Sequence, residues 1–563
     1  MKFSFVNNLK NWQIFLIMAA IIFSLYGQAV FFGFSYLDDN TLILDNFRFI
    51  SDPSNILETF KQDVFHVPGE DAFYYRPFLT IYFMIGAFIG GQNPAAYHFL
   101  NILIHLVAVF LLFIFLQKLE FNRRISFFAS LIFAIHPVLA QAVAWIPGIN
   151  DPLVAVLVLA SFIFFIDYLN SKEWKYLVLH LVFWLGALFS KETAVFAPII
   201  LCLYVFLKKG IFFMGNKNRN WRFFLPIAIG WLLMFGSWFL LRYQALGGRT
   251  LGMSVGQALG CVYRNILSIF LYVGKALLPV NLSVFPFLQD QTFIYGFMAT
   301  AIIATLLYLN RKHVEWKNVV FGAVWFVVFL VPSLLRPNLQ IVPDLLEHRI
   351  YLPLIGLIII LLEIDWKKIG ELLSHFIETT AKNINIALLF ALLLVLFVTT
   401  LIYSRNFQNK ISFWNNAVNN SPHAPLAHRN LGAMYWIDGR PFDAEPEYLK
   451  ALELNPYEPM AHNNLGLIYA QRGDYDNAFK EYEAELKNNP NYDNAFYNMG
   501  LAYWSAGKKE DAAKSWLKAI EINPDLIGAY SGLVVYYQEL GDKKTAQRYF
   551  QEYLSRGGVF PMQ

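Results

Sequence analysis

The sequence predicts an all-α protein: a polytopic membrane helix bundle followed by an α-solenoid. Three observations lead to this fold class. Of the 563 residues, 57% are hydrophobic and only 15% are charged, which is typical of membrane proteins and not of soluble ones. Long apolar runs fill the chain up to about residue 404. After residue 421 they give way to a sequence period of 34 residues, which is typical of a solenoid.

The two parts of the chain also differ in charge. From Ser421 onward there are 14 Lys and Arg against 19 Asp and Glu, a net charge of −5 in a chain whose total is +4. Residues 1–420 therefore carry +9, and their basic residues lie mostly in short segments between apolar runs. This placement indicates contact with anionic lipid headgroups and argues against a nucleic-acid partner.

Eleven apolar stretches are candidates to cross the membrane. A spanning helix needs about 20 mostly apolar residues, and shorter stretches fit tilted or broken helices. The first stretch follows Lys2 and Lys10, is too long for a signal-peptide core and has no small-residue cleavage site after it, so we expect an uncleaved signal anchor. The eleven stretches are about 12–34, 97–117, 125–145, 152–169, 175–190, 193–208, 221–242, 292–310, 317–335, 350–364 and 384–404.

The short basic loops give the orientation. Lys and Arg cluster at 117–124, 208–222, 310–313 and 365–368. Eleven spans with a cytoplasmic N-terminus place all four clusters inside, as the positive-inside rule requires. The same parity places the solenoid outside, so the expected location is a bacterial inner membrane with a periplasmic solenoid, or an endoplasmic reticulum membrane with a lumenal one.

Two long outer loops follow from this parity, at about 35–96 and 243–291. The apolar stretch Phe78–Gly90 is too short to span, and we interpret it as an interfacial helix within the first loop. Residues 261–279 carry Arg264 and Lys275, and counting them as a span would move later basic loops outside. We therefore expect a re-entrant or surface helix there, within a transmembrane domain that covers residues 1–404.

Ionisable residues gather at the outer membrane boundary. Asp38 and Asp39 directly follow the first span, where a carboxylate pair is costly unless it faces a cavity or has a function. The alternative is a solvated loop start or a helix cap. His136 lies in the outward half of its span. The same parity places the following residues outside: Asp38, Asp39, Asp45, Arg48, Tyr75, Arg76, Asn150, Asp151, Lys191, Glu192, Arg336, Glu347, His348 and Arg349.

The C-terminal period is that of tetratricopeptide (TPR) repeats, a helix–turn–helix unit of 34 residues. Four residue types recur at this spacing: Pro422, Pro456, Pro490 and Pro524; Gly439, Gly473, Gly507 and Gly541; Ala444, Ala478, Ala512 and Ala546; Tyr435, Tyr469, Tyr503 and Tyr537. They predict four repeats within 425–560, at about 425–458, 459–492, 493–526 and 527–560. Trp414 and Ala417 match the second helix of a partial repeat in the connecting segment 405–424.

An asparagine recurs in the first helix of three repeats, at Asn430, Asn464 and Asn498. That helix lines the concave face of a TPR stack, where amides can pair with the N–H and C=O groups of a bound peptide. They are therefore candidate residues for binding an acceptor protein. The alternative is that each amide bonds between helices.

Five groups of residues in the membrane part make the chain resemble the GT-C glycosyltransferases, in particular the TPR-bearing O-mannosyltransferases. In order, the groups are Tyr36-Leu-Asp-Asp-Asn40; Tyr75-Arg-Pro-Phe78 with Asn93-Pro and Tyr97-His-Phe-Leu-Asn101; His136-Pro-Val with Ala142-Val-Ala-Trp145 and Gly148-Ile-Asn-Asp151; Ser190-Lys-Glu-Thr-Ala194; and Glu347-His-Arg-Ile-Tyr-Leu-Pro353. The chain departs from the family pattern at Gln141, where an acid is common, and at Ile149, where Arg is common.

The resemblance implies inverting transfer of a sugar, such as mannose, from a polyprenyl-phosphate donor to a Ser or Thr hydroxyl of a protein. A hydroxyl nucleophile needs a base, for which Asp39 is favoured over Asp38. Arg349, His348, Arg76 and Lys191 are the candidates for the leaving phosphate. Glu347, His136, Tyr75 and Glu192 are candidate supporting residues. The adjacent acids could instead hold a divalent metal, but the resemblance implies no metal cofactor.

Two other functions remain open at this point. The same chemistry could act on a lipid or glycan acceptor, with the TPRs as an assembly platform, or the chain could be a non-enzymatic membrane scaffold. A scaffold needs no outer acidic pair and no Arg and His cluster. A transporter is disfavoured, because residues 1–404 show no internal repeat and their charges gather at one face and not at mid-depth.

Overall fold

The computed structural model describes residues 5–65, 74–209, 217–248, 254–335, 345–366, 368, 371 and 381–559. It separates into two compact units, Met1–Asn416 and Ala417–Gln563. The unit boundary falls inside the helix α19 (Lys410–Asn420), which lies in the predicted connecting segment 405–424. The all-helical class predicted from the sequence, a bundle of apolar helices and a TPR solenoid, is confirmed.

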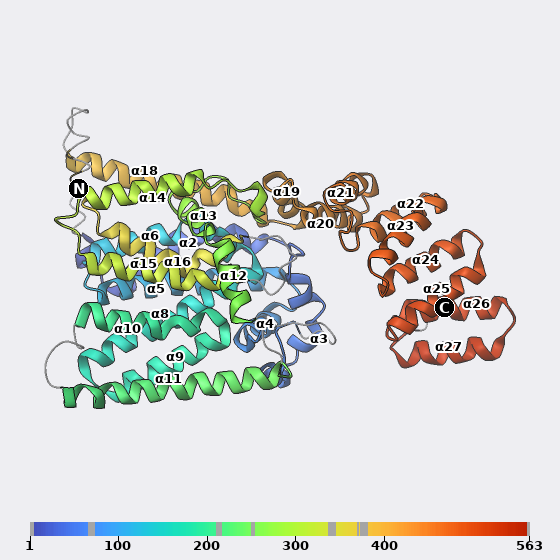
Figure 1. Ribbon diagram of the computed structural model, residues 1–563, viewed down its shortest axis with the longest axis horizontal. Coiled ribbons are helices and arrows are strands. Elements are labelled where there is room, and N and C mark those ends of the chain that lie inside the picture. The colour runs from blue at the N-terminus through green and yellow to red at the C-terminus, as the bar shows by residue number, and fades with distance from the viewer. Residues whose placement is uncertain are drawn as a thin grey trace. The chain divides into compact units, whose positions relative to one another are not determined.

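The first unit is a bundle of helices that run side by side along a common direction (Figure 1). The bundle helices are α2 (Asn11–Tyr26), α5 (Pro94–Lys118), α6 (Arg123–Ala134), α8 (Asn150–Ser171), α9 (Trp174–Ser190), α10 (Ala197–Tyr204), α11 (Lys217–Ala245), α14 (Ile294–Leu309), α15 (Trp316–Leu330), α16 (Tyr351–Leu362) and α18 (Ala381–Ser404). Shorter helices cover one end: α3 (Phe47–Ile50), α4 (Pro77–Gly90), α7 (Ala140–Ala144), α12 (Val255–Asn265) and α13 (Ser268–Leu277). The helix α1 (Phe5–Asn8) precedes the bundle.

Polar bonds between distant segments define the two ends of the bundle. At one end, the Trp145 indole nitrogen donates to Ser35 and the Lys191 amine pairs with Asp151. We call this the site end. At the opposite end, Arg123 donates to the Leu9 carbonyl oxygen at 2.7 Å, and Lys118 pairs with Asp167. The predicted basic loop 117–124 therefore lies at the end away from the acidic pair.

Each of the eleven predicted spans contains helix, but not all are long enough to cross a membrane alone. Within the described ranges, six helices are long and apolar enough, and α6 with the Pro137–Ala144 segment adds a seventh if this pair, bent by 55°, counts as one span. The helices α9 and α14 have 17 and 16 residues. The chain is thus a multi-pass membrane protein, and the number eleven remains a prediction.

The bend after α6 is held by polar side chains from other helices. A helix break leaves carbonyl groups without partners, which is costly in lipid. The His105 ring accordingly lies 3.0 Å from the Ala134 carbonyl oxygen, and the Thr400 hydroxyl donates to the Ile135 carbonyl oxygen at 2.7 Å. His136 caps the next turn by accepting the Val138 N–H, and its other ring nitrogen contacts the Ala276 carbonyl oxygen at 2.8 Å.

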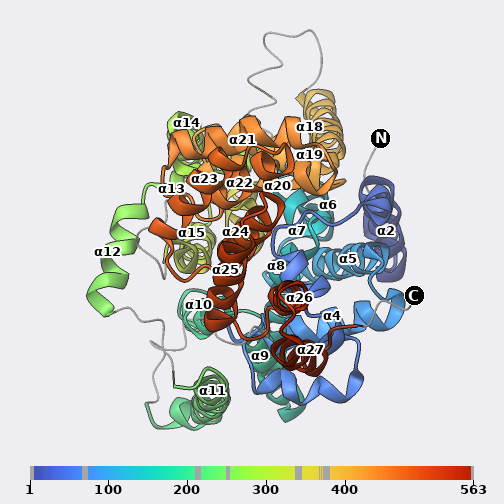
Figure 2. The same ribbon diagram turned by 90° about the vertical axis from the view of Figure 1, so that its right-hand side faces the viewer.

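The short helices attach closely to the bundle. The α4 helix buries Leu79, Tyr82 and Phe83 in a core shared with Tyr97 of α5, while its opposite face leaves Phe88 82% exposed. The helices α13 and α14 lie side by side in both views (Figures 1 and 2). They can approach closely because Gly274 and Gly296 face each other, and a Cβ on Gly274 would meet the Gly296 backbone at 2.8 Å.

The second unit consists of four helix pairs with the predicted repeat (Figures 1 and 2). The helices are α20 (Pro425–Ile437), α21 (Pro441–Leu454), α22 (Ala461–Gln471), α23 (Tyr475–Asn488), α24 (Asp493–Ser505), α25 (Lys509–Ile522), α26 (Ile527–Glu539) and α27 (Lys543–Ser555). The glycine between the helices of each pair has a positive φ, +80° at Gly473, which an L side chain rarely adopts. Gly466 in α22 lies against the Tyr482 ring of α23, so the paired helices touch closely.

Candidate active site

The acidic loop after the first span holds Asp39 in a fixed position. Asp39 is 1% exposed, and its Oδ2 atom accepts the backbone N–H of Ser35 at 2.7 Å and the Ser35 hydroxyl at 3.0 Å. The other carboxyl oxygen, Oδ1, is also buried and has no hydrogen-bond partner. One oxygen of Asp39 is therefore anchored, and the other can still accept a proton.

The environment changes the acidity of Asp39. Burial, which removes water from the charged form, raises the pKa of Asp39 to about 7, and the charge of Asp38 adds to this rise. The two hydrogen bonds from Ser35 oppose the rise because they favour the carboxylate. Asp38 differs: it is exposed and has a left-handed backbone with φ +66°. Of the two predicted acids, Asp39 has the environment of a base that works near neutral pH.

Two tryptophans from distant segments hold the acidic loop. Trp145 donates its indole N–H to Ser35 Oγ at 3.0 Å and to the Leu37 carbonyl oxygen at 3.2 Å. Trp414, at the start of α19 and within the first unit, donates to the Ser35 carbonyl oxygen at 3.0 Å. Nearby, the Gly33 N–H bonds to the Gln408 carbonyl oxygen at 2.8 Å. The predicted connecting segment thus helps to fix the loop that carries Asp39.

A cationic cluster occupies the same end of the bundle. Arg76 donates twice to one carboxyl oxygen of Glu192, at 3.1 and 2.9 Å, and Lys191 pairs with Asp151 at 2.7 Å. Arg349 lies close enough for its charge to act on Lys191. The cluster thus gathers three cationic side chains at one place. This suits an anionic group such as a phosphate.

Electrostatics within the cluster favour a neutral His348. Burial lowers the pKa of His348 well below its ordinary value, and the charges of Lys191, Arg349 and Arg76 lower it further. Burial likewise lowers the pKa of Lys191, although Asp151 partly restores it. Burial opposes the charge of Arg76 as well, but Glu192 outweighs this effect, so the pKa of Arg76 is raised.

Gln141 sets the orientation of the neutral His348 ring. The Gln141 amide nitrogen donates to the Val284 carbonyl oxygen at 2.8 Å, so its oxygen faces His348. That oxygen accepts the His348 backbone N–H at 3.0 Å and lies 3.2 Å from ring atom Nδ1. Because an amide oxygen can only accept, the ring proton belongs on Nδ1. Gln141, a departure from the family pattern, is therefore the partner that fixes His348.

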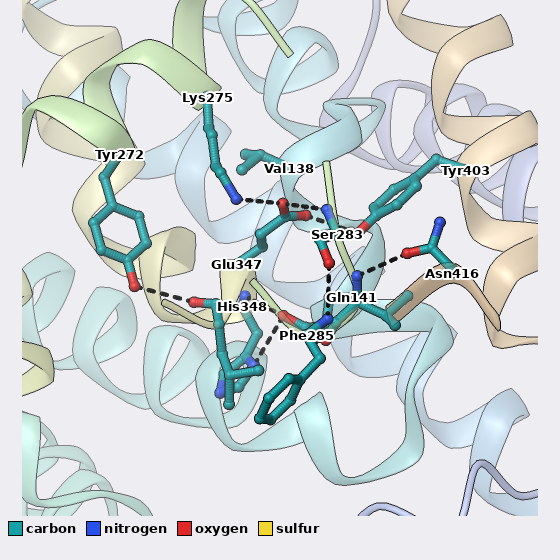
Figure 3. A network of polar contacts seen from close by, with 12 residues as sticks. Val138, Gln141, Tyr272, Lys275, Ser283, Phe285, Glu347, His348, Tyr403 and Asn416 are labelled. Atoms are coloured by element: carbon teal, nitrogen blue, oxygen red, sulfur yellow. Dashed lines mark hydrogen bonds and ion pairs between the residues drawn. The ribbon is translucent and has the colours of Figure 1, made fainter. Parts of the chain in front are cut away.

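Glu347 supports the site from inside the protein (Figure 3). Its carboxylate, which is fully buried, accepts the Lys275 amine at 2.8 Å, the Ser283 backbone N–H at 2.9 Å and the Tyr403 hydroxyl at 2.9 Å. These bonds connect three elements to the turn that carries His348 and Arg349: the helix α13, the helix α18, and the segment that precedes α14. Glu347 thus has a structural environment, in keeping with the supporting role predicted for it.

Tyr75 and His136, also predicted as supporting residues, are engaged away from the cationic cluster. The Tyr75 side chain is buried, and its hydroxyl donates to the Phe60 carbonyl oxygen at 3.0 Å. His136 bonds with Val138 and Ala276, as described above. The structure therefore brings together Arg76, Lys191, Glu192, His348 and Arg349. Arg336 lies outside the residues that the structure describes.

The asparagines of the TPR unit are already engaged. Asn498 donates to the Asn463 side-chain oxygen at 3.0 Å, and the Asn463 amide donates to Asn464 at 3.1 Å. Asn430 accepts the guanidinium of its neighbour Arg429. Of these contacts, only the one from Asn498 joins two helices, α24 and α22, as the alternative interpretation expects; the other two lie within a single helix. A role for Asn430, Asn464 and Asn498 in binding an acceptor remains a prediction.

The sequence contains no indication of Ser35 as a functional residue, and it places Trp145 in a family-like motif and Trp414 in a partial repeat without a role at the site for either. Ser35 lies four residues before Asp39, a spacing at which a hydroxyl can reach the carboxylate, but a single Ser gives no specific signal. Asp151 was recognised as an outer residue, yet its pairing with Lys191 has no signal in the sequence because 40 residues separate them. Across the described ranges, no group of three or more His, Cys, Asp and Glu side chains is placed to hold a metal ion.

Family comparisons agree with the two-part organisation. Residues 76–238 match the family described as dolichyl-phosphate-mannose-protein mannosyltransferase. Residues 447–480, 466–507 and 494–526 match tetratricopeptide repeat families. The mannosyltransferase match begins at Arg76 and includes Gln141, Asp151, Lys191 and Glu192. It leaves out the acidic loop and the turn with Arg349.

Similar curated proteins are named protein O-mannosyl-transferases. Protein O-mannosyl-transferase Tmtc1 of Drosophila melanogaster is 30% identical over 187 residues, which is 33% of this chain and 21% of that protein. TMTC3 of Mus musculus is 30% identical over 36% of this chain and 22% of its own length. F38B6.6 of Caenorhabditis elegans, also a protein O-mannosyl-transferase, is 26% identical over 68% of this chain and 54% of its own.

The chain thus spans about a fifth of the fly and mouse relatives and about half of the nematode one. Among solved structures, that of MamA is 26% identical and covers 26% of this chain and 86% of its own, with a TM-score of 0.25. The resemblance predicted from the motifs is confirmed: this chain is similar to the TPR-containing protein O-mannosyltransferases and combines a mannosyltransferase-family region with tetratricopeptide repeats.

Proposed function

We propose that this protein transfers mannose from a polyprenyl-phosphate donor, of the dolichyl-phosphate type, to Ser or Thr hydroxyls of proteins. The observation that carries the proposal is the pairing of chemistries at the site end. Ser35 bonds to a buried aspartate that has one unpartnered oxygen, and the Ser35 hydroxyl accepts the Trp145 indole N–H. The Trp145 ring also contacts a histidine of the cationic cluster, with ring centroids 5.4 Å apart. The family match of residues 76–238 names the sugar and the carrier.

Asp39 acts as the base in this proposal. A serine or threonine hydroxyl is a weak nucleophile, so its proton must leave as the oxygen attacks the anomeric carbon. The unpartnered Oδ1 of Asp39 is the atom that takes this proton, while Ser35 keeps Oδ2 in place. A base whose pKa is about 7 is ionised in about half of the molecules at neutral pH and still holds the proton well. Asp38, exposed next to it, contacts the acceptor.

The cationic cluster stabilises the leaving group. As the bond from sugar to phosphate breaks, negative charge grows on the lipid phosphate, and fixed donors in a water-poor site stabilise that charge most. Arg349, Arg76 and Lys191 supply these donors. Arg and Lys offer five and three N–H donors, more than one carboxylate partner takes up. Glu192 and Asp151 orient two of the cations.

The TPR unit recruits the protein acceptor, and the site end faces away from the cytoplasm. Repeats of this kind provide an extended concave surface that suits a peptide. The basic loop that contains Lys118 and Arg123 lies at the end of the bundle opposite the site. Under the positive-inside rule, this supports a cytoplasmic position for the loop's end of the bundle. The site then faces the periplasm of a bacterium or the lumen of an endoplasmic reticulum.

The test is a transfer assay with the full chain in liposomes. Polyprenyl-phosphate-linked labelled mannose and a Ser/Thr-rich protein acceptor are added, and label on the acceptor is measured. Asp39→Asn is expected to lower the rate by about 10² to 10⁴-fold because the base is lost. Asp45→Asn, which changes an exposed acid of the same loop, is the matched control and should keep the rate. Absence of transfer by the unmodified chain, or full transfer by Asp39→Asn, would contradict the proposal.

A further inference from the structure

Ser35 stands at the centre of a hydrogen-bond relay whose direction can be assigned. A hydroxyl has one proton to donate and two lone pairs to accept with. Ser35 Oγ faces two groups that only donate, the Trp145 indole N–H at 3.0 Å and the Leu37 backbone N–H at 3.3 Å. It also faces Asp39 Oδ2, which accepts, at 3.0 Å. The hydroxyl proton must therefore point at Asp39.

Trp145 is itself held by a buried network on its other side. The Asn101 amide nitrogen donates to the carbonyl oxygens of Val143 at 3.2 Å and of Trp145 at 3.1 Å, and the Tyr82 hydroxyl bonds to the Asn101 side-chain oxygen. Asn101 is fully buried, so these bonds have no competition from solvent. The backbone that carries Trp145 is thus fixed by α5, while the ring itself is held by its N–H bonds to Ser35 and Leu37.

We infer that Trp145 is a positioning residue for the base: its indole N–H orients the Ser35 hydroxyl toward Asp39 and thereby keeps Oδ1 as the free, proton-accepting oxygen. Trp145 makes no hydrogen bond to Asp39 in this arrangement and acts through Ser35. The role of Asp39 as a base rests on the proposed function, whereas the hydrogen bonds of the relay are a property of the structure.

The relay also makes the charge of Asp39 depend on Trp145. The Ser35 hydrogen bonds favour the carboxylate, as does the backbone N–H of Tyr36, while Asp38 is the charged neighbour that disfavours it. His348 lies across the Trp145 ring, and Lys410 lies over the Tyr36 ring at 5.4 Å. If the indole N–H is removed, the Ser35 hydroxyl loses one of the two donors that orient it, its hydrogen bond to Asp39 weakens, and the pKa of Asp39 should rise.

The experiment follows the protonation of Asp39 by infrared difference spectroscopy of the full chain in lipid. The C=O stretch of its protonated carboxyl group is identified as the band missing in Asp39→Asn. Ser35→Ala should raise the titration midpoint by about one to two pH units, because this is the shift expected from the loss of one hydrogen bond to a charged group. Trp145→Phe should raise it by less, and the double variant should not exceed Ser35→Ala.

The matched control is Trp325→Phe. Trp325 is also fully buried and donates its indole N–H to a backbone carbonyl, that of Leu352 at 2.8 Å, but in α15 and away from the acidic loop. Its variant should leave the Asp39 midpoint unchanged. An unchanged midpoint in Trp145→Phe alongside a raised one in Ser35→Ala would overturn the inference and reduce Trp145 to a packing residue.

Two further measurements keep the outcome clear. If Trp145→Phe does not fold, benzothienylalanine at position 145 keeps the shape of tryptophan with sulfur in place of the N–H, and the same rise is expected. The infrared titration needs no substrate, so it is independent of transfer. If the midpoint shifts while the chain transfers no sugar, the relay stands and the proposed function fails. If the relay and the proposed function both hold, the acidic limb of the pH profile of the transfer rate should move to higher pH by the same amount.

Discussion

Replacing Asp39 by Asn should remove a destabilising effect that depends on pH. Burial raises the pKa of Asp39 from 3.8 to about 7. A group with a raised pKa in the folded state binds its proton more tightly there than in the unfolded chain. The contribution of Asp39 to the free energy of unfolding is therefore most favourable below pH 3.8 and falls as the pH rises toward 7. Above pH 7 this contribution stays constant.

The magnitude follows from the two pKa values. At about 1.36 kcal/mol per pKa unit, the difference between 3.8 and about 7 is roughly 4 kcal/mol of stability lost between these pH values. With about 2.1 cal/mol/K per residue over Met1–Asn416, this corresponds to roughly 4–5 °C in melting temperature. An asparagine keeps the oxygen that Ser35 holds, but its buried amide has no partner and costs about 1–3 kcal/mol at every pH.

The assay is therefore the pH dependence of the difference in melting temperature between Asp39→Asn and the unmodified chain, followed by scanning fluorimetry at pH 4.5, 6 and 8. The constant cost of the amide cancels, and the difference should rise in favour of Asn with pH. Asp45→Asn changes an exposed acid of the same loop that does not adjoin Asp39, and it is the matched control. A flat profile for Asp39→Asn would refute the argument that burial sets the charge of this group.

Four further outcomes are expected. The transfer rate should rise with pH and reach half its plateau near pH 7, because Asp39 must be ionised; a rate independent of pH from 5 to 9 would exclude it as the base. Lys275→Met leaves the Glu347 charge buried without its cation and should cost about 3–5 kcal/mol in unfolding experiments, with partial recovery in Lys275→Met/Glu347→Gln. Gly356→Ala places a methyl group against the Gly322 carbonyl oxygen and should destabilise the α15–α16 contact by about 1–3 kcal/mol, whereas Gly236→Ala meets open space and should not. Deletion of 421–563 should impair transfer to folded protein acceptors and spare a short peptide; equal transfer to both would argue against recruitment by the repeats.

The fold could be predicted because its signals are local and periodic. The 34-residue spacing is repeated at four residue types, and the apolar runs need no knowledge of their neighbours. The break after α6 could not be predicted in the same way, because it depends on His105 and Thr400 from two other helices. Hydropathy shows that a segment can span and does not show where it bends.

The site could be predicted as a set of residues but not as an arrangement. Asp39, Lys191 and Arg349 were identified because charges at a membrane boundary are costly. Their environments depend on residues far away in the sequence: Trp145 and Trp414 reach Ser35 across 110 and 379 positions. No window of the sequence contains that information, and it decides which of the two adjacent acids is buried.

The arrangement around Trp145 explains why the same end of the bundle can hold a base and a phosphate site without their neutralising each other. A direct ion pair between Asp39 and Arg349 or Lys191 would lower the pKa of the carboxyl group and remove its basicity. Asp39 bonds through Oδ2 to Ser35 instead, Ser35 accepts the Trp145 indole N–H, and the Trp145 ring contacts the neutral His348 at a tilted angle with ring centroids 5.4 Å apart. Gln141 serves the same purpose, because a carboxylate in its place would favour the protonated form of His348 and bring a cation toward the Trp145 ring. The departure at Gln141 is therefore consistent with a site that keeps its acid and its cations apart.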